Sequence, residues 1–263
     1  MKIAICVKEV PDPTAEKRID PGTNRLVRSG ENTLNPYDRH AIEEAVRIKE
    51  AGAVSVDEVV AVSMGPDSAD RAIRKAISLG VDRAVHLSDD AVAGSDVAAT
   101  GFALAKALEQ EAPDLVLLGQ QSDDGECYTI GAVVADHLRM PSLTQVIKMD
   151  VSGEGLRCER QAEYGYDTVE VSMPAVISVG DAINEPRYPS LKAIMGAKKK
   201  PVAKVTIGDL GIAADQVGEA GSKARWFNAV APPAKAPGEI IEDEDTNETV
   251  ERIVSWLDER KLI

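Results

Sequence analysis

The first half of the chain alternates short apolar, strand-like segments with longer segments of helical period. The strand candidates are residues 2–7, 58–63, 83–87 and 115–118, and the helix candidates are residues 37–50, 68–79, 96–110 and 129–138. Strands that alternate with helices in this way pair in parallel, so the order predicts an α/β fold with a doubly wound, mostly parallel sheet. In such a sheet, ligands bind beyond the carboxyl ends of the strands, where the strand order reverses.

Composition narrows the range of partners. The formal net charge of the 263-residue chain is -14, which disfavours binding to nucleic acid or to an anionic membrane surface. Aromatic residues make up only 3%, so the core must consist mainly of aliphatic side chains. The sequence has no apolar run long enough to span a membrane, and it begins with the strand-like Ile3–Val7 instead of a signal peptide. We therefore expect a cytoplasmic protein that does not insert into membranes.

The residues usually found in catalytic and metal sites are scattered. Cys6, Cys127 and Cys158 are far apart, lack a C-x-x-C pair and are expected to be reduced thiols, and no set of residues predicts a metal site. The sequence contains no H-E-x-x-H motif, no P-loop and no evident pair of nucleophile and base. We expect the chain to carry no catalytic residues of its own, so that a cofactor has to supply any chemistry.

Three loops follow the predicted strands at the binding edge, namely residues 7–11, 64–66 and 119–131. The last loop leads into a helix, whose N-terminal N–H groups could bind a phosphate together with the Thr129 hydroxyl. Acidic residues in this loop favour a monophosphate, or a pyrophosphate bound mainly through the backbone, over a more highly charged ligand. A solvated turn that binds nothing is the alternative interpretation.

The second half begins with a strand pattern and continues into a loop. Polar and apolar residues alternate from 168 to 173, which predicts a strand with one wet face. Pro174 interrupts this pattern, and residues 175–179 form an apolar run typical of a strand that is buried on both faces. Pro186 and Pro189 then predict a stiff loop with Leu191 at its tip.

The chain changes character after residue 207. Residues 1–207 are predicted to form the α/β domain, and residues 208–263 an extended arm and a final helix. Residues 218–238 have the composition of a linker, and the acidic run 242–245 precedes a helical pattern over 246–262. That helix would carry one apolar face, formed by Val250, Ile253, Val254 and Leu257. We expect this arm to pack on a partner chain, with Trp226 as an anchor; packing on its own domain is the alternative.

The segments 160–179 and 184–191 together resemble the signature of the beta subunits of electron transfer flavoproteins. Further blocks match this family in order, at Val7-Lys8 and at residues 35–38, 63–66 and 117–119, with Gln121 and Asp124 following. The resemblance extends over about residues 1 to 212. It implies an adenine-nucleotide-binding, Rossmann-like domain.

In that family the beta subunit has a pocket for AMP. The cofactor-binding positions that the resemblance implies are Cys6, Asn35, Pro36, Tyr37, Asp38, Met64, Gly119, Gln121, Asp124, Gly125, Tyr128, Thr129 and Ile130. Tyr128 and Thr129 replace an Asn-Gln pair common in AMP-binding members, and Asp124-Gly125 resembles the electron-bifurcating branch, which holds a second FAD there. AMP and a second FAD therefore both stay open.

Local chemistry offers a second interpretation of the Asn-Pro block. Asn35 followed by Pro36 is a good helix N-cap with proline in the first turn, and it needs no ligand. Both interpretations can hold, because an Asn side chain fixed by capping would present its remaining amide group to an adenine edge.

The resemblance also implies protein partners. A separate alpha subunit would hold most of the FAD in a heterodimer, and acyl-CoA or other flavin dehydrogenases would dock on a loop near residues 184–200. The docking residues are expected to be Tyr188, Leu191, Ile194 and Met195, beside a basic rim of Arg187, Lys192, Lys198, Lys199 and Lys200. Tyr37 and Pro13 would lie near the flavin. In the hairpin, Gln161 beside Arg160 replaces a common glutamate, which predicts a weaker clamp on the flavin domain.

We therefore expect a beta subunit that helps to shuttle electrons between dehydrogenases and an acceptor through FAD, in either a simple carrier or an NADH-dependent bifurcating complex. The alternative is a stand-alone α/β protein that senses an adenine nucleotide and has no redox role.

Overall fold

The computed structural model describes residues 1–263 except 154, 231, 234, 236, 239 and 242–244. The chain forms two compact units, Met1–Ala229 and Val230–Ile263. Of the acidic run expected at 242–245, residues 242–244 lie outside the described residues, and so do parts of the linker expected at 218–238.

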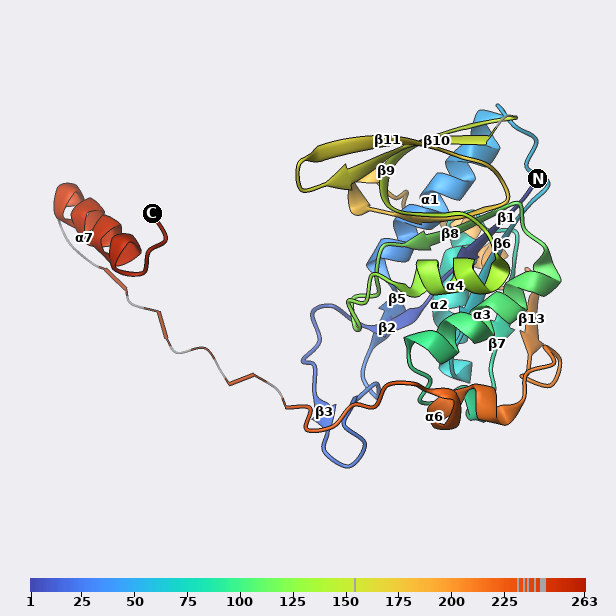
Figure 1. The fold of residues 1–263 in the computed structure, drawn as a ribbon, viewed down its shortest axis with the longest axis horizontal. Helices are drawn as coiled ribbons and strands as arrows, with labels where there is room; N and C mark the ends of the chain where they lie inside the picture. Colours follow the sequence, from blue (N-terminus) through green and yellow to red (C-terminus); the bar gives the residue numbers. More distant parts are fainter. Residues whose placement is uncertain (154, 231, 234, 236, 239, 242–244) are drawn as a thin grey trace. The chain divides into compact units, whose positions relative to one another are not determined.

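The first unit is built on a nine-stranded sheet with the order β11-β10-β9-β12-β8-β1-β6-β7-β13 (Figure 1). Its parallel strands are β1 (Lys2–Cys6), β6 (Glu58–Met64), β7 (Arg83–Leu87), β8 (Leu115–Gly119), β9 (Ser142–Ser152), β12 (Ala175–Val179) and β13 (Val202–Val205). The doubly wound, mostly parallel α/β sheet predicted from the sequence is thus confirmed. The chain runs from β1 through β6 to β7 on one side and then crosses to β8 on the other, so the strand order reverses between β1 and β8.

Helices cover both faces of this sheet. They are α1 (Pro36–Ala51), α2 (Asp70–Ser78), α3 (Val97–Glu111) and α4 (Ile130–Leu138). Ile42 of α1 and Ile73 of α2 pack with one face of the central strands, and Leu108 of α3 and Val134 of α4 pack with the other. Because β1 and β6 are buried on both sides, their sequences are continuous apolar runs and do not alternate.

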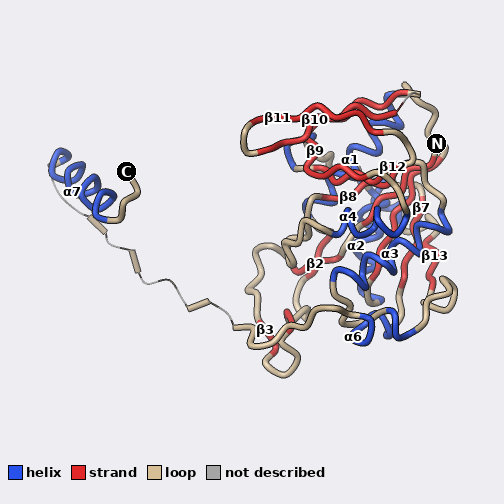
Figure 2. Tube along the Cα trace, in the orientation of Figure 1, coloured by secondary structure: helices blue, strands red, loops and turns tan. Residues whose placement is uncertain are grey.

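A long antiparallel ribbon extends one edge of the sheet. It consists of β9, β10 (Gly155–Ala162) and β11 (Gly165–Val171), and Figure 2 shows it in red at the top of the compact unit. Thr168 and Glu170 are exposed and Val171 is buried, which confirms the wet and dry faces expected for this strand. The predicted buried strand 175–179 is β12, and all five of its residues are buried.

The remaining elements of the first unit are short. They are β2 (Glu9–Pro11), β3 (Ile19–Asp20), β4 (Arg25–Leu26), β5 (Asn32–Leu34), η1 (Asp67–Ala69), η2 (Asp90–Val92), η3 (Asp181–Ile183), α5 (Leu191–Ala197), η4 (Ala214–Gln216) and α6 (Gly218–Gly221). β2 pairs with β5 and β3 with β4, so residues 12–31 form an excursion that leaves the sheet and returns to it.

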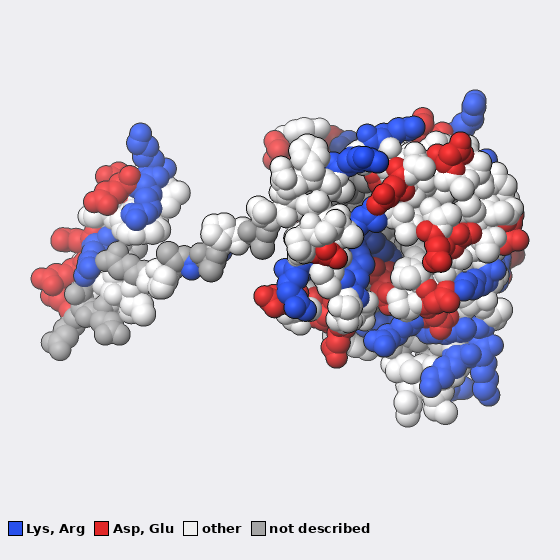
Figure 3. Space-filling view, turned by 90° about the horizontal axis from the view of Figure 1, so that it is seen from below, with Lys and Arg blue, Asp and Glu red and all other residues white. Residues whose placement is uncertain are grey.

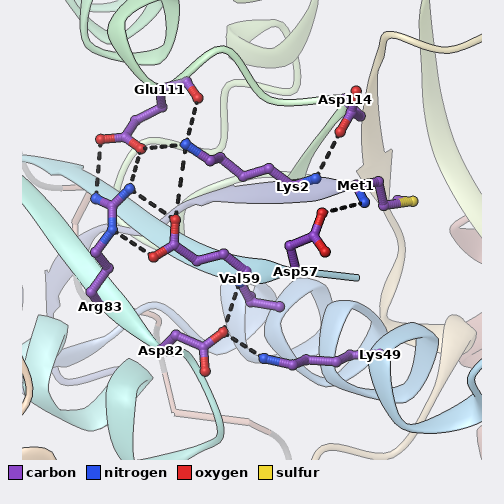
Figure 4. A network of polar contacts seen from close by, with 10 residues as sticks. Met1, Lys2, Lys49, Asp57, Val59, Asp82, Arg83, Glu111 and Asp114 are labelled. Atoms are coloured by element: carbon purple, nitrogen blue, oxygen red, sulfur yellow. Dashed lines mark hydrogen bonds and ion pairs between the residues drawn. The ribbon is translucent and has the colours of Figure 1, made fainter. Parts of the chain in front are cut away.

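A network of ion pairs lies where the parallel strands begin, at the end of the sheet opposite the carboxyl ends of the strands (Figure 4). The guanidinium of Arg83 on β7 donates to Glu58 of β6 over 2.8 and 3.0 Å and also binds Glu111 at the end of α3. Lys2 of β1 donates its ammonium to the Glu111 carbonyl over 2.9 Å. These contacts connect three adjacent strands and a helix at the edge where the strands begin, which leaves the other edge for ligands.

Residues 208–229 pack within the first unit. Ser222 Oγ donates to the Gly218 carbonyl and accepts from Asp96 N, and the Asp96 carboxylate accepts from the backbone N–H of Lys223 and of Ala224. Ala229 N donates to the side chain of Asn24, and Figure 1 shows this orange segment beside β3. The first unit therefore extends past the expected boundary at residue 207, because α3 accepts this segment at its capped N-terminus.

The second unit contains α7 (Thr246–Glu259), for which Asp245 is the N-cap. None of the residues of α7, all of which the structure describes, is buried. Val250, Ile253 and Val254 are 53%, 45% and 47% exposed. Within the part of this unit that the structure describes, the apolar face of α7 is therefore about half exposed. Among the described residues, no helix is both long enough and apolar enough to cross a membrane.

Candidate nucleotide site and docking surface

Some of the predicted nucleotide residues, namely Asn35, Tyr37, Asp38, Gly119 and Gln121, meet at the carboxyl ends of β1 and β8, where the strand order reverses. Asn35, directly before α1, is 1% exposed, and its Nδ2 donates to Asp38 Oδ1 over 2.7 Å and to the Gln121 carbonyl over 2.9 Å. Its Oδ1 accepts from Asp123 N over 3.1 Å. The Asn35 side chain therefore ties the start of α1 to the loop after β8.

This geometry changes the role expected for Asn35. It is the N-cap residue of α1 and Pro36 is in the first turn, as the sequence predicts, but its side chain makes no capping hydrogen bond. Both hydrogens of its amide group and its oxygen are used within the protein. The loop after β8 and Asp38 thus use both amide hydrogens, and a contact from Asn35 to an adenine edge would rest on the second lone pair of Oδ1.

Asp38 lies at the centre of this cluster and is 5% exposed. Its Oδ2 accepts from Lys8 N over 2.8 Å. Burial raises the pKa of Asp38 to about 7, although the hydrogen bonds from Asn35 and from the Lys8 backbone oppose the shift. Burial, together with the nearby Asp38, also raises the pKa of Cys6 to about 12, so this thiol is unreactive at neutral pH.

Gly119 is required by packing. A Cβ atom at this position would lie 2.6 Å from the carbonyl carbon of Tyr37 and 2.8 Å from Asp38 N. The first turn of α1 therefore rests directly on the end of β8, which brings Tyr37, Asp38 and Gly119 together as the sequence predicts. Any larger residue would push the helix away from the site.

Asp124 is the ionic centre of the loop. Its side chain is 1% exposed, its Oδ1 accepts from Lys8 Nζ over 2.8 Å, and its Oδ2 binds the Arg28 guanidinium. Burial opposes ionisation, but Lys8 and Arg28 outweigh it and lower the pKa of Asp124 to about 2. Lys17 binds the neighbouring Asp123 over 3.1 Å. Residues 12–31 are thus fastened over the loop by charge.

The end of the loop near α4 is more open. Tyr128 is 45% exposed, and Thr129, the N-cap residue, contacts Cys127 Sγ through its hydroxyl over 3.1 Å. No hydrogen bond among the described residues connects Tyr128, Thr129 or Ile130 to the Asn35 cluster, and the same holds for Met64. Gly125 lies in the turn after Asp124, at the exposed surface.

Three buried polar atoms at this edge lack partners. Among the described residues, Ser63 Oγ, Gln121 Oε1 and Ser178 Oγ are buried without a hydrogen bond. They belong to the ends of β6, β8 and β12, and a Cβ atom on Gly131 of α4 would lie 3.7 Å from Ser178 Cβ. Ser63 and Ser178 lie on opposite faces of the sheet, because Ala61 of β6 packs in the core under α1 and α2, whereas Val176 of β12 packs in the core under α3 and α4. The three atoms therefore do not converge on one ligand.

Several of these residues could not be found from the sequence as site residues. Lys8 is visible only as a charge directly after a strand, and Arg28 lies in a stretch with no regular period. Two surface hollows, of about 240 and 280 Å³, are lined by none of the predicted residues.

The predicted docking residues form an exposed apolar patch. Tyr188, Leu191, Ile194 and Met195 are 88%, 74%, 44% and 64% exposed. Leu191 is the first residue of the short helix α5 and not the tip of a loop, because Ser190 accepts a hydrogen bond from Ala193 N and caps a helix there. Three of these four side chains are therefore spaced at helical positions 191, 194 and 195.

Two cations of the expected basic rim bind groups of their own chain. Arg187 pairs with Glu43 and Glu50 of α1, and Lys200 Nζ donates to the Val81 carbonyl over 2.7 Å. Lys192, Lys198 and Lys199 remain as the cations of this segment. Figure 3 shows Lys and Arg interspersed with Asp and Glu on one face of the protein. Arg160 and Gln161 are both exposed on β10, where Gln161 stands opposite Tyr166 of β11.

Comparison with known proteins identifies the family. The model of the electron transfer flavoprotein domain matches residues 23–210. The chain is 40% identical to the electron transfer flavoprotein subunit beta of Mycobacterium tuberculosis over 99% of both chains. It is 39% identical to that of Thermoanaerobacterium thermosaccharolyticum and 36% identical to the caffeyl-CoA reductase-Etf complex subunit CarD of Acetobacterium woodii, with both chains covered in full. The chain belongs to the electron transfer flavoprotein family, as a beta subunit.

Proposed function

We propose that the chain pairs with an electron transfer flavoprotein alpha subunit and that the heterodimer carries electrons from flavin dehydrogenases to an acceptor. FAD, held mostly by the alpha subunit, would supply the redox chemistry. The exposed apolar face of α7 supports a partner chain, because Val250, Ile253 and Val254 are about half exposed within the described part of their own unit. The arm would wrap the alpha subunit, with the exposed Trp226 as an anchor.

The site at the ends of β1 and β8 would bind AMP. The observation that carries this proposal is the meeting of the start of α1 with the loop after β8, through Asn35, Asp38 and Gln121, at the point where the strand order reverses. The phosphate would lie at the N-terminus of α4, whose first N–H groups have no partner within the helix. Charge also favours a monophosphate over a more highly charged ligand, because Asp124 offsets one of the two positive charges of Lys8 and Arg28.

A second FAD in place of AMP is the other candidate. It is favoured by the Asp124-Gly125 sequence and by the likeness to the Acetobacterium woodii protein, whose name places it in a caffeyl-CoA reductase-Etf complex. The chain would in that case serve a bifurcating complex and not a simple carrier. The two candidates differ in the amount of FAD and AMP that each heterodimer contains.

Coexpression with the alpha subunit tests the proposal. We expect a yellow 1:1 complex, which after denaturation releases one FAD and one AMP, identified by absorbance and mass spectrometry. Expressed alone, the chain should be colourless and poorly soluble. Two FAD and no AMP would identify the bifurcating type. A beta chain that stays monomeric and ignores the alpha chain in size-exclusion chromatography would instead support a nucleotide sensor.

A further inference from the structure

The segment that leads into the docking helix α5 is fastened to α1. Arg187 Nε donates to Glu43 Oε2 over 2.8 Å, and its two terminal nitrogens donate to Glu50 over 2.7 and 2.8 Å. Asn184 Nδ2 donates to the His40 carbonyl over 3.0 Å and to Glu44 Oε2 over 2.9 Å. Residues 184 and 187 thus contact three successive turns of one helix.

The other end of α5 is fastened to α2. Arg74 Nη1 donates to the Ala197 carbonyl over 3.0 Å and to the Lys200 carbonyl over 2.7 Å. The Ala197 side chain is 3% exposed and belongs to the core. The apolar patch of Tyr188, Leu191, Ile194 and Met195 therefore lies between two fixed ends, each of which depends on an arginine.

Charge shows that Arg187 is poorly suited to attract a partner. Its single positive charge faces two carboxylates, one of which, Glu43, has a side chain only 8% exposed. The sum of the three charges is negative. By contrast, the side chains of Lys192, Lys198 and Lys199 form no hydrogen bond or ion pair with any described residue. A planar guanidinium that binds two carboxylates fixes geometry in a way that a single ammonium cannot.

We propose that Arg187 is a positioning residue: by joining Glu43 and Glu50, it holds residues 188–197 in the orientation that docks. The inference rests on the proposed function, in which the patch enters an apolar pocket of a flavin dehydrogenase. We call the contacts of Arg187 with Glu43 and Glu50 the latch. A preformed patch loses less conformational entropy on binding than a mobile loop, so the latch increases the affinity for the partner without contacting it.

The first test needs no dehydrogenase. In the purified heterodimer, Arg187→Gln should accelerate amide hydrogen exchange in residues 188–197 by about tenfold, because the local opening equilibrium shifts when the latch is lost. Lys199→Gln is the matched control. It removes the same charge from the same segment, but its described side chain is in no hydrogen bond or ion pair, so exchange should stay unchanged. Equal protection in Arg187→Gln and the wild type would overturn the inference.

A second variant separates positioning from attraction by the sign of its effect. Glu50→Gln removes one partner of Arg187 and makes the surface more positive. If Arg187 attracted an acidic dehydrogenase, this variant would bind it better; if Arg187 positions α5, the variant should bind about two- to fivefold more weakly, in keeping with the modest value of an exposed ion pair. Because the Glu50 side chain is 59% exposed, its replacement should not disturb folding. Weaker binding of this variant would therefore not be explained by misfolding.

The kinetic readout uses an acyl-CoA dehydrogenase reduced by its substrate, with the heterodimer as electron acceptor. We expect KM for the heterodimer to rise in Arg187→Gln and Glu50→Gln, and to do so equally at low and high salt, with an unchanged flavin spectrum. A loss that disappears at high salt would assign Arg187 to electrostatic attraction. If the wild-type heterodimer accepts no electrons from any acyl-CoA dehydrogenase while exchange still responds to Arg187→Gln, the docking proposal fails and the latch stands.

Discussion

Lys8 Nζ donates to Asp124 Oδ1 over 2.8 Å and so joins the end of the first strand to the loop that follows β8, 116 residues further along the chain. The two residues stand on either side of the point where the strand order reverses. The Asp124 side chain is almost fully buried, whereas the Lys8 side chain is 42% exposed, so the pair holds a buried carboxylate against a partly solvated cation.

Asp124→Asn should destabilise the beta subunit. A neutral amide cannot pair with Lys8 and Arg28, and the lowered pKa of Asp124 corresponds to about 2 kcal/mol of stability. For a domain of this size, that loss lowers Tm by about 4–8 °C, which differential scanning calorimetry of the heterodimer would measure. Asp123→Asn is the control, because its exposed pair with Lys17 should contribute less than about 1 kcal/mol. Equal Tm values for the two variants would contradict this account.

Stability should depend on pH in two opposite ways. Asp124 has a lowered pKa of about 2, so its contribution is present above its unfolded value near 4 and is lost as pH falls from about 4 to about 2. Asp38 has a raised pKa of about 7, so between about pH 4 and 7 the unfolded state releases its proton first and stability falls as pH rises. Carbon-13 NMR of the Asp38 carboxyl should show a midpoint near 7; a midpoint near 4 would refute the second part.

Leu191→Ala should weaken docking and leave folding intact. Burial of this side chain in a partner's pocket contributes about 1.5–3 kcal/mol, which corresponds to a loss of affinity of roughly ten- to a hundredfold. Since Leu191 is 74% exposed, the Tm and the flavin spectrum should not change. Steady-state electron transfer from a reduced dehydrogenase is the measurement, and unaltered kinetics would exclude Leu191 as the anchor.

Thr129→Arg should empty the nucleotide site. Thr129 is the N-cap residue of α4, and a long side chain there would crowd the proposed phosphate position. Nucleotide content per heterodimer, measured by mass spectrometry after denaturation, should fall to a small fraction of the wild-type value. Thr168→Arg, on the exposed face of β11, serves as a control that adds the same side chain elsewhere. Full nucleotide content in Thr129→Arg would show that the phosphate lies at another place.

The sequence by itself determined the positions of most helices and strands and the family of the protein. A strand that is buried on both faces needs an unbroken apolar segment. The apolar runs 58–63 and 115–118 therefore predicted such strands. The alternation from 168 to 173 was equally decisive, since a strand with one wet face must alternate. The resemblance across ordered blocks identified the family, and the predicted strand, helix and hairpin positions agree with the structure to within a few residues.

Only the tertiary structure decided how the side chains are used. Asn35, Asp124 and Arg187 stand out in the sequence as polar residues in loops, but their partners, Gln121, Lys8 and Glu43, are 86, 116 and 144 residues away. Local patterns carry no information about which distant group a polar side chain will meet. For that reason, only the structure shows that Asn35 joins the start of α1 to the loop after β8 and that Arg187 joins the segment before α5 to α1.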